Sequence, residues 1–170
     1  MIITPFLVVF MILVFVLLFL FLNTVDKRKW LTAIISLILT PFAYFYLFYP
    51  FVNIVSNHHH QKYFNSEAWI EKPNLRYEMI DYTIASDTLK GMTKDELTQV
   101  LGTYEWLSWD DSKKAHDDNK WNYGLGIEPG AFNDKVECVE ITFEKGKVFS
   151  LKPFQQEITF EKKDNSNEGQ

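Results

Sequence analysis

Residues 89–102 read LKGMTKDELTQVLG, and this stretch contains the signals for both ends of one short helix. Thr93 is suited to the N-cap position, and Glu96 completes a capping box in which each side chain accepts the backbone N–H of the other residue. Gly102 supplies the left-handed residue that ends a helix. One apolar face recurs at helical spacing and is formed by Leu97, Val100 and Leu101. We therefore expect a capped helix that packs on a core through this face.

A second helix is predicted immediately before this stretch, over residues 74–86, because Leu75, Met79 and Tyr82 fall on one helical face. After Gly102 the apolar residues alternate with a period of two, which is typical of strands. The predicted strands cover residues 104–109, 120–125, 136–143 and 148–151, with a further edge strand at 157–160. Residues 110–119 are predicted to form a polar loop, and Gly146 is predicted to lie in a hairpin turn. The pattern predicts an α+β fold, with two helices packed on an antiparallel meander sheet.

The stretch at 89–102 also resembles the signature of the SmpA/OmlA family, the small BamE-like envelope lipoproteins. The resemblance extends over residues 76–151 and includes an aromatic strand and a final hairpin, represented by Trp121, Tyr123, Gly126, Ile141, Phe143, Gly146 and Val148. It implies that the helices pack on one face of the sheet. Two features depart from the family. Thr103 stands where a proline often follows the Leu-Gly pair, and there is no lipobox cysteine near the N-terminus, so the lipoprotein's role does not carry over.

The N-terminal third of the chain has the composition of a membrane anchor. Every residue from Phe6 to Leu22 is apolar, and a second apolar stretch covers residues 31–55. Each is long enough to cross the hydrocarbon layer, which takes about 20 helical residues. A cleaved signal peptide would need a basic start and small residues at a cleavage site, and the sequence offers neither. We therefore expect contact with the lipid bilayer through residues 2–22 and 31–55. Pro41 is expected to disturb the second helix.

The charges around these stretches predict an orientation. Lys27, Arg28 and Lys29 lie in the short link between the two apolar stretches, whereas both outer flanks carry few basic residues. Because basic residues favour the cytoplasmic side, the link is predicted to be cytoplasmic and both ends to be outside. The prediction is a multi-pass protein of the bacterial cell (inner) membrane with an extracytoplasmic C-terminal domain.

These observations divide the chain into four predicted parts. Residues 1–55 form a two-helix transmembrane anchor, residues 56–73 a juxtamembrane connector, residues 74–160 the BamE-like domain and residues 161–170 a disordered tail. The chain holds 17 basic and 22 acidic residues, and residues 56–170 hold 14 and 21 of them, a net charge of −7. An acidic domain without a basic stripe argues against binding nucleic acid.

Few residues of the sequence are candidates for catalysis or metal binding. His58, His59 and His60 are the most visible cluster, but adjacent histidines on an extended chain point to alternate sides, so they are only minor candidates for a metal site. Cys138 lies in a predicted strand and is expected to be a buried, inert thiol. No phosphate-binding loop, nucleophile elbow or metalloprotease motif occurs in the sequence. We therefore predict no enzyme activity and no cofactor.

The aromatic residues of the predicted strands suggest binding instead. Trp106, Trp121 and Tyr123 are predicted to form one face, which is either core or a surface for a protein partner. The preferred function is a non-catalytic role in protein–protein interaction or scaffolding in the cell envelope. The alternative is a metal- or pH-responsive sensor, or an accessory subunit of a membrane enzyme complex, that uses the histidine run.

Overall fold

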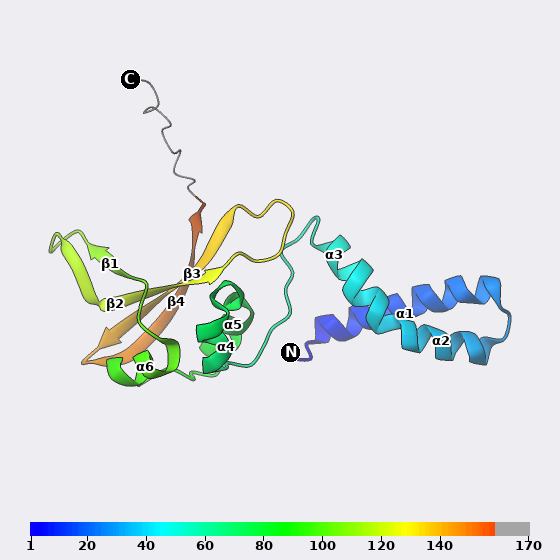
Figure 1. The fold of residues 1–170 in the computed structure, drawn as a ribbon, viewed down its shortest axis with the longest axis horizontal. Coiled ribbons are helices and arrows are strands. Elements are labelled where there is room, and N and C mark those ends of the chain that lie inside the picture. Colours follow the sequence, from blue (N-terminus) through cyan, green and yellow to red (C-terminus); the bar gives the residue numbers. More distant parts are fainter. Residues whose placement is uncertain (159–170) are drawn as a thin grey trace, which may run out of the picture. The chain divides into compact units, whose positions relative to one another are not determined.

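The computed structural model describes residues 1–158, and contacts within the chain divide it into two compact units. One unit comprises Met1–Tyr63 together with Glu128–Asn133, and the other comprises Phe64–Ile127 together with the described residues 134–158. Figure 1 shows N-terminal helices followed by small helices and a sheet. The predicted tail at 161–170 lies outside the described residues.

The first unit is built on two antiparallel helical segments that lie side by side (Figure 1). Helix α1 spans Pro5–Val25, and it begins where the Thr4 hydroxyl oxygen accepts the Leu7 N–H at 3.2 Å. The second segment consists of α2 (Lys29–Ala43), a π-helical turn and α3 (Tyr49–Val52). By length and composition both segments, of 21 and 24 residues, are apolar enough to cross a membrane.

Small polar side chains lie buried on α2. Thr32, Ser36 and Thr40 follow one another at one-turn intervals, and each is at most 4% exposed. Their hydroxyl groups donate to carbonyls in the preceding turn; for example, Ser36 Oγ donates to Thr32 O at 2.7 Å. Because the hydroxyl groups are satisfied within their own helix, α1 and α2 can approach closely across these small residues.

The second helical segment changes its hydrogen-bond pattern after Pro41, as the sequence predicted. Pro41 has no N–H to donate, and the π-helical turn Tyr44–Phe48 begins three residues later. The segment continues as α3 and ends at Val52.

The second unit contains short helices that the sequence predicted incompletely. Its helices are α4 (Ser66–Glu71), a 3₁₀ turn at Pro73–Leu75, α5 (Tyr77–Ala85) and α6 (Lys94–Leu101). The prediction of one helix over residues 74–86 was wrong at its start, where the 3₁₀ turn precedes α5. Helix α4 lies within the predicted connector at 56–73, and Trp69 of that helix is fully buried.

Helix α6 confirms the predicted capping. The Thr93 hydroxyl accepts the Glu96 N–H at 3.3 Å, and the Glu96 carboxylate accepts the Thr93 N–H at 2.8 Å. Thr93 donates to the Glu96 carboxylate through its N–H and, at 3.0 Å, through its hydroxyl, and these two hydrogen bonds lower the pKa of the Glu96 carboxyl. Gly102 closes the helix with a φ of +80°. Leu97 and Leu101, both predicted to face the core, are at most 1% exposed.

The sheet is a four-stranded antiparallel meander in the order β1-β2-β3-β4. The strands are β1 (Trp106–Asp110), β2 (Ala115–Gly126), β3 (Lys135–Glu144) and β4 (Lys147–Glu157). Strand β2 begins earlier than predicted, so the polar loop predicted at 110–119 is shorter. Strand β4 continues through Pro153, so no separate edge strand begins at Glu157; residues 159–160 lie outside the described part of the chain.

Strand β4 forms one edge of the sheet. Near its start, Val148 exchanges backbone hydrogen bonds with the chain that leads into α6: Gly91 N donates to Val148 O at 2.9 Å, and Val148 N donates to Met92 O at 2.8 Å. Farther along, Pro153 lies within the strand, as is tolerated at a sheet edge. The β3–β4 turn places both Lys145 and Gly146 at positive φ, as a tight type I′ hairpin requires.

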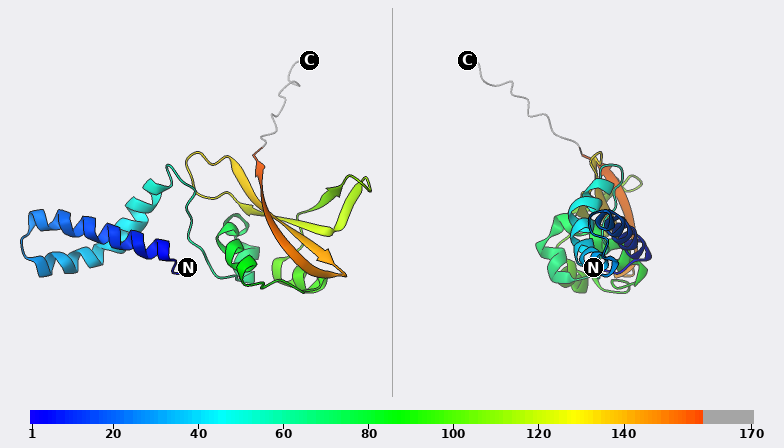
Figure 2. Two further views of the ribbon diagram at one scale, coloured as in Figure 1. Left: turned by 180° about the vertical axis from the view of Figure 1, so that it is seen from behind. Right: turned by 90° about the vertical axis from the view of Figure 1, so that its right-hand side faces the viewer.

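The core of this unit lies between the helices and one face of the sheet (Figure 2). The helices contribute buried side chains that include Trp69, Met79, Ile80, Leu97 and Leu101. The sheet contributes Trp121, Tyr123, Val139, Ile141 and Phe143. The α+β arrangement predicted from the periodicities is therefore confirmed.

The capped helix provides the first prediction. Thr93→Ala removes one cap and is expected to lower the free energy of unfolding by about 1 kcal/mol. Leu97→Ala leaves a cavity at a fully buried position and is expected to cost about 2–5 kcal/mol. Chemical denaturation of the full chain in detergent, followed by near-UV circular dichroism, measures both. Equal small losses would contradict the burial of this face.

Candidate binding surface on the open face of the sheet

The register of β1 and β2 decides which aromatic residues face the helices. Leu107 pairs with Trp121, and Trp106 pairs with Asn122. Because successive side chains of a strand point to opposite faces, Trp106 and Trp121 lie on opposite sides of the sheet. Trp121 packs against Phe143 in the core, with ring centroids 4.8 Å apart.

The predicted single face of Trp106, Trp121 and Tyr123 is therefore not formed. Trp121 is 8% exposed and Tyr123 is fully buried beneath the helices. The Tyr123 hydroxyl donates to Gly102 O at 3.0 Å, which joins β2 to the end of α6. Burial raises the pKa of this phenol. Of the three predicted residues, only Trp106 lies on the face away from the helices.

A buried arginine joins the helical layer to the sheet. Arg76 is 7% exposed, and its Nε donates to Trp69 O at 2.8 Å. Its Nη1 donates to Glu105 Oε1 at 2.6 Å and to Gly124 O at 2.9 Å. The guanidinium carbon also lies 5.1 Å from the centre of the Trp69 ring and 5.9 Å from that of Tyr123. These contacts satisfy a charge that would be costly to bury alone.

On the open face, one row of side chains crosses all four strands. Trp106 of β1 pairs with Asn122 of β2, Asn122 with Glu140 of β3, and Glu140 with Lys152 of β4. Side chains of directly paired residues lie on the same face of a sheet, so this row places an aromatic ring, an amide, a carboxylate and an ammonium group side by side.

Hydrogen bonds fix the middle of this row. Asn122, only 1% exposed, donates through Nδ2 to Ser108 Oγ at 2.9 Å. Ser108 Oγ in turn donates to Glu140 Oε2 at 2.5 Å. Lys120 Nζ lies 3.8 Å from Glu140 Oε1. Because the Glu140 carboxylate is held from two sides, it presents a fixed acceptor to anything that lies over the sheet.

The row lies in a groove of about 510 Å³. Aromatic side chains of β1 and β4 line it, and polar side chains lie between them; the lining comprises Trp106, Leu107, Ser108, Trp109, Lys120, Asn122, Glu140, Lys152, Phe154 and Gln156. Trp109 is 56% exposed. Aromatic anchors around a few placed polar groups are typical of a surface that recognises a ligand.

Cys138 lies beside this groove but is closed to solvent. It pairs with Gly124 on one side and with Phe154 on the other, and it is 1% exposed. Burial, with a smaller contribution from the charges of Glu137 and Glu105, raises the pKa of the thiol to about 11. The structure thus confirms the predicted burial of Cys138.

The histidine run belongs to the first unit, and its side chains do alternate. His58 and His60 lie together, with ring centroids 5.6 Å apart, and both contact Tyr49. His59 is directed to the 128–133 loop, where its Nδ1 lies 3.4 Å from Glu128 Oε1. Within residues 1–158, no three His, Cys, Asp or Glu side chains form a group that could hold a metal ion.

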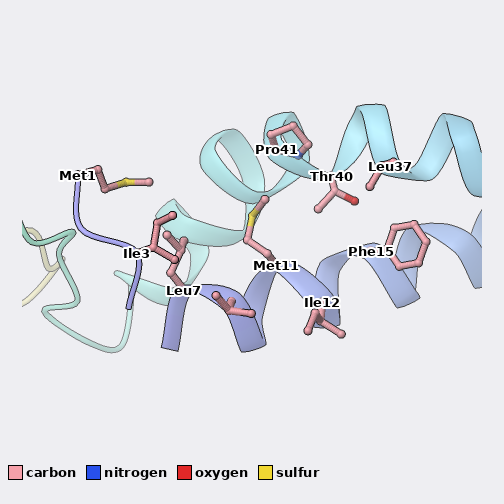
Figure 3. A pocket seen from close by; sticks show the side chains of 10 residues that line it. Met1, Ile3, Leu7, Met11, Ile12, Phe15, Leu37, Thr40 and Pro41 are labelled. Carbon is pink, nitrogen blue, oxygen red and sulfur yellow. The ribbon is translucent and has the colours of Figure 1, made fainter. Parts of the chain in front are cut away.

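The first unit also contains an apolar groove of about 530 Å³ between α1 and α2 (Figure 3). Its walls include Leu7, Met11, Phe15 and Leu37, and Thr40 is its only hydroxyl-bearing side chain. No charged side chain of the described residues lines this groove, so the candidate binding surface is the open face of the sheet.

Several residues of this surface were not predicted from the sequence. Ser108, Asn122, Glu140 and Lys152 are polar residues on strands, and only their cross-strand pairing brings them into one row. The alternation of Val139, Ile141 and Phe143 toward the core was a usable signal for Glu140, which must then face outward. Phe154 was missed because the predicted strand ended before Pro153.

The structure defines a class: an α+β domain with one face of its meander sheet covered by helices and the other open, in a chain that begins with two long apolar helices. The chain matches no protein-family model, no curated protein and no solved structure.

Proposed function

We propose that this chain is a non-catalytic membrane-anchored envelope protein that binds a protein partner through the open face of its sheet. The observation that carries the proposal is the row from Trp106 to Lys152, which crosses four strands on the face opposite the helices. The row combines a tryptophan anchor with both signs of charge, as centres and rims of protein interfaces do. The acidic balance of residues 56–170 favours a protein over nucleic acid.

Membrane anchorage rests on the two apolar segments. Helices of 21 and 24 residues extend about 31 and 36 Å, enough for a hydrocarbon layer of roughly 30 Å. In a bilayer, lipid chains would fill the apolar groove between α1 and α2. The resemblance of residues 76–151 to the SmpA/OmlA family supports an envelope role, since the capped helix and the hairpin that carry it are both formed.

The binding proposal is tested by truncating two tryptophans that lie on opposite faces of the same strand pair. Trp106→Ala is expected to weaken partner binding by 2 kcal/mol or more, about thirtyfold, with little loss of stability. The matched control Trp121→Ala is expected to cost about 3–5 kcal/mol of folding free energy, because Trp121 is core. Unfolding of each full-length variant in detergent separates the two effects.

The partner is identified by photocrosslinking in cells that express the full chain. With p-benzoylphenylalanine in place of Lys152, we expect a discrete, protease-sensitive adduct that disappears when Trp106→Ala is added. Lys90, exposed in the turn between α5 and α6, is the control position and should give no such adduct. Equal adducts at both positions, or an adduct that protease does not digest, would contradict a protein partner on this face.

The orientation is a separate part of the proposal. We infer that Lys27, Arg28 and Lys29 are cytoplasmic and that both chain ends are outside, because positive charge is retained on the cytoplasmic side. A reporter that is active only outside the cytoplasm, fused after Gln170, is expected to be active. Replacing the three basic residues with glutamine should weaken this preference. Activity of a cytoplasm-only reporter at the same site would show the opposite orientation.

A second candidate function, a pH-responsive sensor, is favoured by the packing of His58. Its ring lies 4.4 Å from that of Phe6 and near those of Tyr49 and His60. Burial, and secondarily the charge of His59, lower the pKa of His58 below its usual 6.5. The neutral form is therefore favoured in the folded state, and the unfolded state takes up a proton first as the pH falls.

It follows that acid should loosen this cluster. The contribution of His58 to stability is complete above pH 6.5 or so and declines below it. Hydrogen exchange of residues 56–63 is expected to accelerate between pH 7.5 and pH 5.5, after correction for the intrinsic exchange rate. His58→Phe, which keeps a ring but cannot be protonated, should reduce the change. The same acceleration in the variant would assign the response to groups other than His58.

A further inference from the structure

The loop between β2 and β3 belongs to the first unit rather than to the sheet that it connects. Residues Glu128–Asn133 group with Met1–Tyr63. Ala131 N donates to Asn53 O at 2.9 Å, and Asn53 is the residue that caps the end of α3. The loop is therefore bonded to the chain at the point where the second apolar segment ends.

Two further contacts hold the loop there. Gly130 lies so close to the chain after α3 that a Cβ atom on it would be 2.3 Å from Asn57 Oδ1, so a larger residue could not take its place without a shift. Glu128 Oε1 lies 3.4 Å from His59 Nδ1. Within the loop, Asn133 Nδ2 donates to Glu128 O at 3.0 Å. Together these contacts fix the backbone on both sides of Phe132.

Phe132 is nevertheless 85% exposed, the largest exposed fraction among the large apolar side chains of residues 1–158. Its backbone neighbour Ala131 is bonded to Asn53, so Phe132 lies at the end of the apolar segment. Other apolar side chains at this end are also exposed: Phe51 is 68% exposed and Val55 is 82% exposed. An ordered loop bonded to the end of the segment therefore carries an exposed phenylalanine, and the last residues of the segment are exposed apolar side chains as well.

The length of the second apolar segment indicates how deep Asn53 lies in a membrane. Trp30, 67% exposed at the start of the segment, is suited to one boundary of the hydrocarbon layer. A layer of about 30 Å then ends near Pro50, roughly 20 residues later, at about 1.5 Å per residue. Asn53 lies about 5 Å beyond, inside the headgroup region, which adds roughly 5–7 Å on each side.

We propose that the 128–133 loop is a second membrane contact and that the Phe132 ring enters the lipid at the boundary between headgroups and acyl chains. This inference rests on the membrane span proposed above for Lys29–Val52. Residues 127–134 contain two acidic residues and no basic one, so the contact is apolar rather than a salt-dependent attraction to anionic lipid. Zwitterionic lipid, which has no net charge, is therefore a sufficient partner.

The test places a fluorophore at the loop in the full chain. Phe132→Cys is labelled with the polarity-sensitive dye NBD and reconstituted into phosphatidylcholine nanodiscs with or without a lipid that carries a doxyl quencher near the headgroup. The unmodified chain is the labelling blank, because its one cysteine, Cys138, is buried. Val55→Cys is the matched position at the end of the helix, and the NBD adduct of glutathione is the aqueous reference.

We expect the label at position 132 to lose emission by roughly twofold, comparable to the label at position 55, because a shallow quencher lies at the depth of an interfacial side chain. Quenching no greater than that of the glutathione adduct, with normal quenching at position 55, would overturn the loop contact and leave the span intact. Absence of quenching at both positions would overturn the span and the loop contact together. Quenching that requires anionic lipid would contradict an apolar contact.

Discussion

The second unit depends on the way in which one buried positive charge is satisfied. Arg76 follows the 3₁₀ turn of the helical layer, yet its guanidinium bonds to a helix carbonyl, to a strand carbonyl and to the Glu105 carboxylate that precedes β1. The guanidinium donates from two separate nitrogens, Nε and Nη1, whereas the three donors of a lysine ammonium group all lie on one nitrogen. Removing any one partner would leave a polar group buried without compensation. The charge therefore ties the helices, β1 and β2 to one relative position.

The same carboxylate also bonds to the backbone of β2. Glu105 reaches over Gly124, whose N–H donates to Glu105 Oε2 at 3.0 Å. A Cβ atom on Gly124 would lie 3.0 Å from that oxygen, so the absence of a side chain allows the carboxylate to bridge Arg76 and the strand. The two faces of the sheet differ because successive side chains of each strand point to opposite sides and only one side packs on the helices. One is filled by aromatic and aliphatic side chains, and the other carries a fixed row of unlike polar groups.

The parts of this structure that were predictable from the sequence are those with local causes. Helix α6 carries its cap, its apolar face and its terminating glycine within one stretch, and all three are formed. Helix α4 has six residues, too few to be stable alone; Asn65 caps its start, but the packing of Trp69 in the core, which stabilises it, is a non-local contact. The face of Trp106 depends on pairing with Asn122 rather than Trp121, and register is a non-local property. For the same reason Ser108, Glu140 and Lys152 could be named individually but not as one surface.

Strand β4 shows how the sheet is kept from growing. An edge strand exposes unpaired backbone groups to which another chain can add a strand. Here the first part of the edge is already bonded, through Val148, to the chain before α6, and Pro153 removes a donor from the part that follows. A second copy of the sheet thus finds no continuous ladder along β4. Two copies of this domain can therefore meet at β4 without joining their sheets through this edge.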